Sequence, residues 1–334
     1  MKVVLTLLVR DEADVLEDHL AFHFAAGVDV VIATDHRSVD GTTEILERYE
    51  REGVLHLIRE RDEGLRQSEY VTRMARLAAS EHGADWIIHS DADEFWWPRG
   101  GSLKEALAAV PPRYGTVRGV WRSFPPRPDD GGFFADRMTV RLAAQAPIHD
   151  PTSPFRPNAK IVHRADPAVT VAGGNHDVSS RVLAPLRAWF PFEVLHFPIR
   201  SLAQAERKYV TTFTAWDTRR EPAPFVARAY EEFRAGRLRA YYDALAVDDE
   251  TLARGLDDGS LVIDTRLRDA LRGSVFPRGD LAEEASLAVD VALLGEADVV
   301  RLQRRADEVE SRLDALEARP LRRQLSPKRL LGRA

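Results

Sequence analysis

The sequence predicts an α/β protein with a mostly parallel sheet that is flanked by helices and followed by a helical C-terminal extension. Over the first hundred residues, short apolar runs typical of strands alternate with amphipathic patterns typical of helices. These helical patterns are about 10–15 residues long, as in right-handed βαβ units. From Leu202 onward the pattern is mostly helical.

Four strands and three helices are expected in this N-terminal part. Gly27 and Gly53 follow the first two helices, and glycine is common just past a helix end because it adopts the left-handed conformation there. The run Trp86–Ile88 is apolar without alternation, as in a strand that is covered on both faces. The strands are expected at about residues 2–9, 28–34, 54–58 and 85–90, and the helices at about residues 14–26, 40–52 and 68–81.

The middle of the chain has a different character. Residues 111–158 are rich in proline, glycine and aromatic residues, so we expect irregular hairpins and long loops, in which substrate-binding residues often lie. Further short strands are expected at residues 160–163 and 193–197.

The C-terminal region carries two further patterns. Apolar residues recur among dense alternating charges from about residue 283 to 318, which predicts an amphipathic helix or a short coiled coil that could join copies of the chain. The last fifteen residues hold several arginines and one lysine among leucines. They predict a solvated basic tail, with peripheral attachment to anionic membrane lipid as the alternative.

Composition limits the class and the compartment. The 334 residues are 44% hydrophobic and 30% charged, as in soluble globular proteins, and the net charge of −6 argues against a nucleic-acid binder. The chain has no cysteine, which excludes disulfides and thiolate zinc sites. The apolar run Val3–Val9 is too short to span a bilayer, so we expect a cytoplasmic protein, with contact at the inner face of the membrane as the only alternative.

Three acids follow the fourth expected strand directly. Asp91, Asp93 and Glu94 form a D-x-D-E pattern at the place where an open α/β sheet binds its ligands. Neighbouring carboxylates repel one another unless a cation neutralises them. Hard oxygen ligands suit Mg²⁺ or Mn²⁺ bridging a diphosphate, while a strand-end turn or a helix cap is the alternative interpretation.

Polar residues also follow the first two expected strands. Asp35 can accept hydrogen bonds from a base edge or from ribose hydroxyls, whereas Asp40 is better suited to capping the next helix. Arg10 can contact a phosphate or pair with Asp11 or Glu12.

The order of these motifs resembles the N-terminal half of a family 2-like glycosyltransferase with the GT-A fold, in the branch that also resembles family 92. The resemblance covers roughly residues 2–215. It rests on residues 5–12, on residues 27–42, on residues 86–95 with the D-x-D-E-F pattern, on Trp121 to Phe124, on Lys160 to His163, on Val171 to His176, and on His196 to Ser201 with Lys208 downstream.

The resemblance implies a division of the chain and roles for several residues. Residues 1–215 would form the GT-A domain, with a nucleotide-binding half at 1–100 and an acceptor and metal half at 101–215, and residues 216–334 a helical region. Asp35 matches the acid that contacts the base, Asp91 the acid near the ribose and the metal, and Asp93 the acid that coordinates Mn²⁺ or Mg²⁺. Donor-side positions are Thr6, Arg10, and either Arg73 or Arg76. The loop departs from the family at His36, Arg37 and Val39, which leaves its contacts open.

The same resemblance implies an inverting reaction with one general base. Asp177 is our first choice because it follows a polar, glycine-rich turn; the other candidates are Glu94, Asp150 and Glu193. His176 and His196 are either structural residues or ligands of the metal or the diphosphate, and His196 is favoured because it ends an apolar strand. Trp96, Trp97 and Trp121 either stack on sugar rings or belong to the core.

The sequence therefore predicts a metal-dependent, inverting glycosyltransferase. Its donor would be a UDP-, GDP- or dTDP-sugar, and its acceptor a hydroxyl of a glycan or a lipid-linked molecule, as in polysaccharide biosynthesis. The alternatives are a nucleotidyltransferase of similar fold and a non-catalytic carbohydrate-binding or scaffold protein. A nucleotidyltransferase would normally show a glycine-rich basic loop after the first strand, where this chain is acidic.

Overall fold

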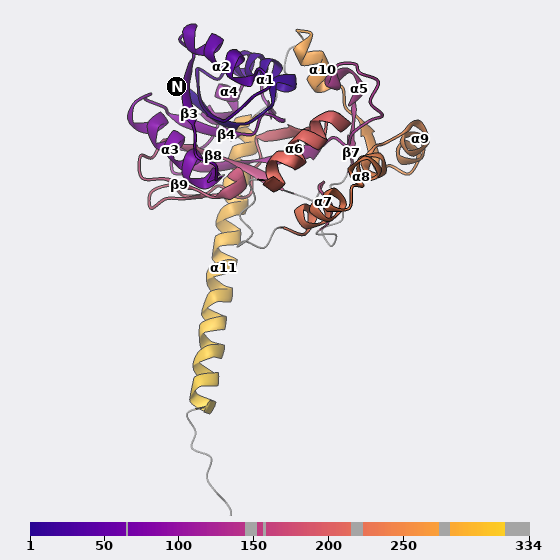
Figure 1. Ribbon diagram of the computed structural model, residues 1–334. Coiled ribbons are helices and arrows are strands. Elements are labelled where there is room, and N and C mark those ends of the chain that lie inside the picture. Colours follow the sequence, from indigo (N-terminus) through magenta and orange to yellow (C-terminus); the bar gives the residue numbers. More distant parts are fainter. Residues whose placement is uncertain (65, 144–151, 156–157, 215–222, 274–280, 318–334) are drawn as a thin grey trace, which may run out of the picture.

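An eight-stranded sheet forms the centre of the molecule in a computed structural model that describes residues 1–317, except 65, 144–151, 156–157, 215–222 and 274–280 (Figure 1). The strand order is β3-β2-β1-β4-β8-β6-β11-β5, and six of the eight strands run in one direction, with β5 and β8 opposed to them. The strands are β1 (Val3–Val9), β2 (Val30–His36), β3 (Leu55–Glu60), β4 (Trp86–Ser90), β5 (Glu94–Pro98), β6 (Thr116–Ser123), β8 (Ala159–Arg164) and β11 (Phe192–His196). The predicted α/β class with a mostly parallel sheet is confirmed.

Helices cover both faces of this sheet. One core cluster joins the sheet to α1, α2, α4 and the start of α11, and a second joins its other face to α3 and the small hairpin β9–β10. The N-terminal helices are α1 (Ala13–Ala26), α2 (Thr42–Arg51), α3 (Gln67–Ser80), α4 (Leu103–Ala108) and α5 (Phe134–Arg137). The later ones are α6 (Leu202–Thr214), α7 (Pro224–Arg234), α8 (Leu238–Leu245), α9 (Asp249–Asp257), α10 (Arg266–Leu271) and α11 (Leu281–Glu317).

Two small sheets lie beside the large one. The hairpin β9 (Thr170–Val171) and β10 (Val178–Ser179) encloses a short 3₁₀ turn at Gly173–Asn175. Strand β12 (Leu261–Ile263) pairs with β7 (Val140–Leu142), so segments on both sides of the predicted boundary near residue 215 are joined. The division of the chain at that residue stays a prediction.

Strand direction brings distant residues to one edge of the sheet. Strands β1, β2, β4 and β11 all end at the same edge, because parallel strands share an orientation. Strand β5 starts at that edge and runs back, so that Glu94 is paired with His196 at the end of β11. The acidic turn between β4 and β5 therefore lies beside the end of β11.

The sequence missed two strands of the sheet. Strand β6 lies in the segment that was expected to be irregular, and β5 begins within the acidic motif itself. Strand β6 packs closely because it carries Gly119, where an added Cβ would lie 2.8 Å from both Trp96 Cζ3 and Val194 Cγ2. Because Gly119 has no side chain, the indole of Trp96 from β5 can pack over β6.

Some predictions fall outside the described residues. These are the candidate base Asp150 and the basic tail from residue 319 onward. Among the helices that the structure describes, none combines the length and the apolar character that crossing a membrane requires.

Replacing Gly119 by alanine should destabilise the fold by about 1–3 kcal/mol, because the new methyl group overpacks the contact with Trp96. Gly64→Ala is the matched control, since a Cβ there meets nothing within 4 Å. Thermal unfolding of both variants measures the difference. Equal melting temperatures for the two would contradict this account of β6.

Candidate functional site

A cavity of about 440 Å³ opens at the edge of the sheet where the acidic turn lies. Asp91, Ala92 and Asp93 form part of its wall together with the end of β1. The opposite wall comes from the segment after β11 and from helices α6 and α7. The cavity thus joins the N-terminal part of the sheet to the C-terminal helices.

Lys160 forms ion pairs with two of the acids. Its side chain is 1% exposed, and its Nζ lies 2.6 Å from Asp91 Oδ2 and 2.9 Å from Glu94 Oε1. Burial works to lower the pKa of Lys160, but the two carboxylates outweigh it and hold that pKa above its ordinary value. Lys160 is therefore a permanent cation beside Asp91.

Glu94 is the most deeply buried of the three acids. Its carboxylate also accepts a hydrogen bond of 3.1 Å from Trp121 Nε1. Burial raises the pKa of Glu94 to about 8, with the neighbouring Asp91 and Asp93 adding to the rise and Lys160 opposing it. Glu94 supports the turn from within the protein.

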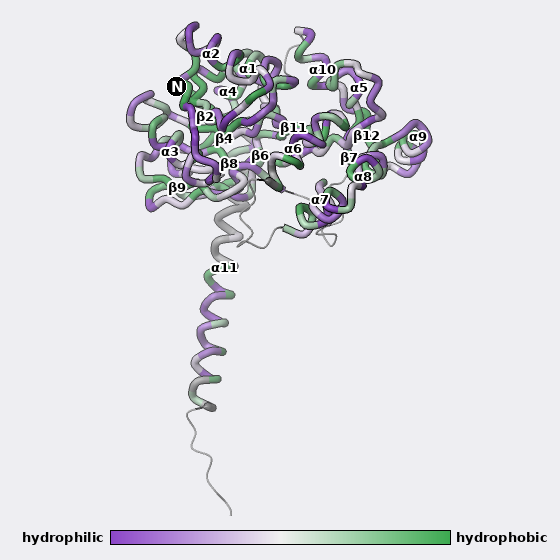
Figure 2. Tube along the Cα trace, in the orientation of Figure 1, coloured by the Kyte–Doolittle hydropathy of each residue, from purple (hydrophilic) through white to green (hydrophobic). Residues whose placement is uncertain are grey.

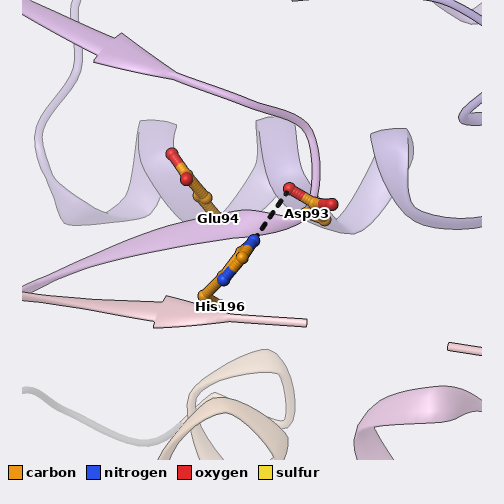
Figure 3. A group of neighbouring side chains, drawn as sticks. All are labelled: Asp93, Glu94 and His196. Atoms are coloured by element: carbon orange, nitrogen blue, oxygen red, sulfur yellow. Dashed lines mark ion pairs between the residues drawn. The ribbon is translucent and has the colours of Figure 1, made fainter. Parts of the chain in front are cut away.

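Asp93 has a different environment from Glu94. Lys208 Nζ of α6 donates to Asp93 Oδ2 over 2.6 Å, while Asp93 Oδ1 faces His196 Nε2 at 3.8 Å. Burial alone would raise the pKa of Asp93, but Lys208, His196 and Arg200 together hold it well below its ordinary value. Asp93 is ionised and keeps Oδ1 turned toward the histidine (Figure 3).

His196 is held neutral in the wall of the cavity. Its ring stacks on Trp121 with centroids 4.2 Å apart, and its buried Nδ1 has no hydrogen-bond partner among the described residues. Burial lowers the pKa of His196 to about 4. A neutral imidazole beside an ionised carboxylate is a donor set that suits Mn²⁺ or another divalent cation.

Asp93, Glu94 and His196 fit a metal ion by geometry. Their ligand atoms all lie within 4.8 Å of one another, and all three residues are buried. Figure 3 shows Glu94 directed to the side of the Asp93–His196 pair, which agrees with its bonds to Lys160 and Trp121. The best donors are therefore Asp93 Oδ1 and His196 Nε2.

His176 lines the cavity, and both of its ring nitrogens have hydrogen-bond partners. Its Nδ1 lies 2.9 Å from the carbonyl oxygen of Ala159, so it donates there, and its Nε2 accepts from Asn158 Nδ2 over 3.1 Å. Both ring nitrogens are thus engaged. A metal-binding role for His176 would require one of these bonds to break.

Two of the five residues predicted to bind the donor line the cavity, and Thr6, Asp35 and Arg73 do not. Arg10 and Asp91 form part of its wall. Thr6 is buried within the sheet, where its hydroxyl is 2.7 Å from His89 Nδ1. Arg73 lies on the outer side of α3 and pairs with Glu60 at 3.1 Å.

Asp35 is bound by its own loop. Its carboxylate accepts from the Ser38 N–H over 3.1 Å and from the Thr43 hydroxyl over 2.5 Å, and it is outside the residues that line the cavity. The neighbouring His36 does line the cavity. Contact between Asp35 and a base stays a prediction.

Asp177 lies just outside the cavity, next to His176 in its wall. Its side chain is 57% exposed, and its Oδ2 is 3.7 Å from an amino group of Arg118. The alternative candidate Glu193 is not among the residues that line the cavity, and it forms ion pairs with Arg122 and Arg266. Arg76, the alternative to Arg73, donates from Nε to the carbonyl of Val169.

Sequence reasoning gave no role to several residues of this site. Lys160 and Lys208 were noted only as parts of the family pattern, although they neutralise the acidic turn. Arg200 is 1% exposed and pairs with Glu12 and Asp14, which fixes the start of α1 to the segment after β11. A lysine directly before the apolar pair Ile161 and Val162 of a strand, as at position 160, is a sequence signal that could have indicated this.

No protein-family model matches the chain, and no curated protein matches it. Solved structures are similar to it at low identity. Residues 1–349 of S. aureus TarS in complex with UDP are 13% identical, with a TM-score of 0.34 over 81% of this chain and 90% of that one. The mannosyltransferase PcManGT from Pyrobaculum calidifontis, in complex with GDP-Man and Mn²⁺, is 18% identical, with a TM-score of 0.35 over 86% of this chain and 80% of that one.

A third solved structure is glucosyl-3-phosphoglycerate synthase from Mycobacterium tuberculosis with Mn²⁺, UDP and glucosyl-3-phosphoglycerate. It is 15% identical, with a TM-score of 0.25 over 38% of this chain and 45% of that one. Likenesses at this level leave the activity open. The function must therefore be argued from the residues of this chain.

Glu94 should make stability depend on pH. Its pKa is raised in the folded state. Its stabilising contribution to the free energy of unfolding is therefore fully present below its unfolded pKa of about 4.5 and is lost as the pH rises through about 8. Glu94→Gln removes this titration, and the variant should gain stability relative to the native chain between pH 5 and pH 9. Urea unfolding across that range, in the presence of a chelator, measures the difference. If the free energies of unfolding of the variant and the native chain differed by the same amount at every pH, the raised pKa of Glu94 would be contradicted.

Proposed function

We propose that the protein is a metal-dependent, inverting glycosyltransferase of the GT-A type that uses a nucleotide-sugar donor. The observation that carries this proposal is the pairing of ionised Asp93 with neutral His196 at the cavity wall, at the carboxyl edge of a parallel sheet. A divalent cation held by these two residues would polarise the donor diphosphate and stabilise the charge that develops as it leaves.

Four basic side chains, set among four acidic ones in the cavity wall, support the binding of a diphosphate together with a divalent cation. Arg10, Lys160, Arg207 and Lys208 all contribute to its wall. Fixed cations stabilise a leaving group whose negative charge grows in the transition state. Lys208 is well placed for this because its ammonium group already lies at Asp93.

The far end of the cavity supports an acceptor that carries an apolar group. It is lined by apolar and aromatic side chains of the segment after β11 and of helices α6 and α7, where Tyr209 stacks on Phe213 with centroids 5.6 Å apart. Of the two predicted acceptor classes, a lipid-linked molecule suits these side chains better than a free glycan. The residues are Pro198, Ile199, Tyr209, Phe213, Phe225, Val226 and Ala229.

Asp177 stays our proposed general base. Its Oδ2 lies 3.7 Å from the guanidinium of Arg118, its side chain is accessible to solvent, and the adjacent His176 lines the cavity. Asp91 is the competing carboxylate, because it lines the cavity directly, but Lys160 and Asn175 already occupy its oxygens.

Donor binding should depend on Mn²⁺. Titration calorimetry with UDP-, GDP- and dTDP-sugars should detect binding of one nucleotide class, with the affinity at least tenfold higher when Mn²⁺ is present, because the cation bridges Asp93 and the diphosphate. Asp93→Asn should lose this dependence, whereas Asp243→Asn, an exposed acid on α8, should retain it. The absence of binding for every nucleotide tested would refute the proposal.

Asp177→Asn should leave donor affinity unchanged and lower the rate of transfer by about 10²–10⁴-fold, as expected for the loss of a general base. Asp91→Asn provides the comparison, because its removal should weaken donor binding as well. Initial rates at saturating donor, together with calorimetry, separate the two effects. Full activity of the Asp177 variant would eliminate it as the base.

A further inference from the structure

Helix α11 extends far beyond the domain that it starts from. Leu281, Ala285 and Ala288 in its first turns are buried against the sheet domain. The distal half projects away from the rest of the described chain (Figure 1). Apolar positions there are exposed, with Val299 and Leu302 at 64%, Val309 at 55% and Leu313 at 52%.

These exposed apolar residues follow a heptad pattern. Val299, Leu302, Ala306, Val309 and Leu313 recur at alternating intervals of three and four residues, which correspond to positions a and d of a coiled coil. Charged and polar residues fill most of the remaining positions, and Figure 2 shows a largely hydrophilic helix with isolated hydrophobic positions. A helix that exposes such a stripe along one side gains stability when the stripe is covered.

We propose that the distal half of α11 forms a parallel, two-stranded coiled coil with a second copy of this chain. Charge complementarity indicates that the partner helix belongs to a second copy of this chain. In the heptad set by Val299 at position a, Arg305 and Arg312 take position g and Glu310 takes position e. In a parallel pair in register, Arg305 of each copy faces Glu310 of the other, because position g lies beside the following position e of its neighbour.

The same charges disfavour an antiparallel arrangement. Position g then faces position g of the other helix, and Arg305 would lie opposite Arg312. The residue types at the start of the stripe also indicate two strands, because β-branched Val299 at a with Leu302 at d favours dimers.

Sedimentation equilibrium of the full chain tests the association. We expect a dimer whose population grows with concentration, and Leu302→Asp should abolish it. Val300→Asp is the matched control, because Val300 is also an exposed valine of α11, at 52%, but lies off the stripe. A monomer at every concentration, or equal effects of the two substitutions, would overturn the proposal.

The cysteine-free chain allows a direct test of orientation. Ala306→Cys and Leu313→Cys, made separately, should each form a disulfide-linked dimer on mild oxidation, whereas Glu308→Cys on the outer side should not. In an antiparallel pair, a residue meets the same residue of the other helix at only one point along the stripe. At most one of the two cysteine variants could then form the disulfide. Crosslinking at only one of them would therefore overturn the parallel arrangement.

Charge reversal tests the pairing itself. Arg305→Glu and Glu310→Arg should each weaken the dimer roughly tenfold, because each replaces two attractive pairs by repulsive ones. An equimolar mixture of the two variants should form a heterodimer of native affinity, since both pairs become attractive again. A heterodimer that stays as weak as the two single variants would refute the proposed register. These measurements do not depend on any enzymatic activity, so they stand apart from the function proposed above.

Discussion

The rest of the site depends on the ion pairs between two lysines and an acidic turn. Asp91, Asp93 and Glu94 follow one another closely at the end of β4, and buried carboxylates are costly unless they are paired. Lys160 reaches them from β8 and Lys208 from α6. The same two contacts therefore attach a central strand and a C-terminal helix to the edge of the sheet.

This pairing leaves the residues of the site in different ionisation states. Asp93 is shared between Lys208 on one oxygen and His196 on the other, and its pKa stays low. Glu94 is turned into the protein, where burial raises its pKa. Adjacent acids thus differ in charge and in role: Asp93 is available to a cation, and Glu94 fixes the turn and the indole of Trp121.

Much of the fold could be predicted from local patterns, and much of the site could not. Strands β1 to β4 could be predicted because each is a short, largely apolar run that ends near an acid. Strand β6 was missed because Arg118, Gly119 and Arg122 interrupt its apolar pattern within a proline-rich segment. The turn was recognised as a site, but its lysines lie 69 and 115 residues away from their partners, and no local pattern connects residues so distant in sequence.

The cavity draws its two ends from different parts of the chain. Its acids follow strands β1 and β4 of the sheet, whereas its apolar side chains come largely from the segment after β11 and from α6 and α7, with α6 also supplying Arg207 and Lys208. Substitutions in α7 can reshape the apolar end while the acidic turn keeps its lysines. In evolutionary terms, if the cavity takes the donor and the acceptor proposed above, substitutions in α7 alone would let a lineage change its acceptor while the acidic turn stays the same.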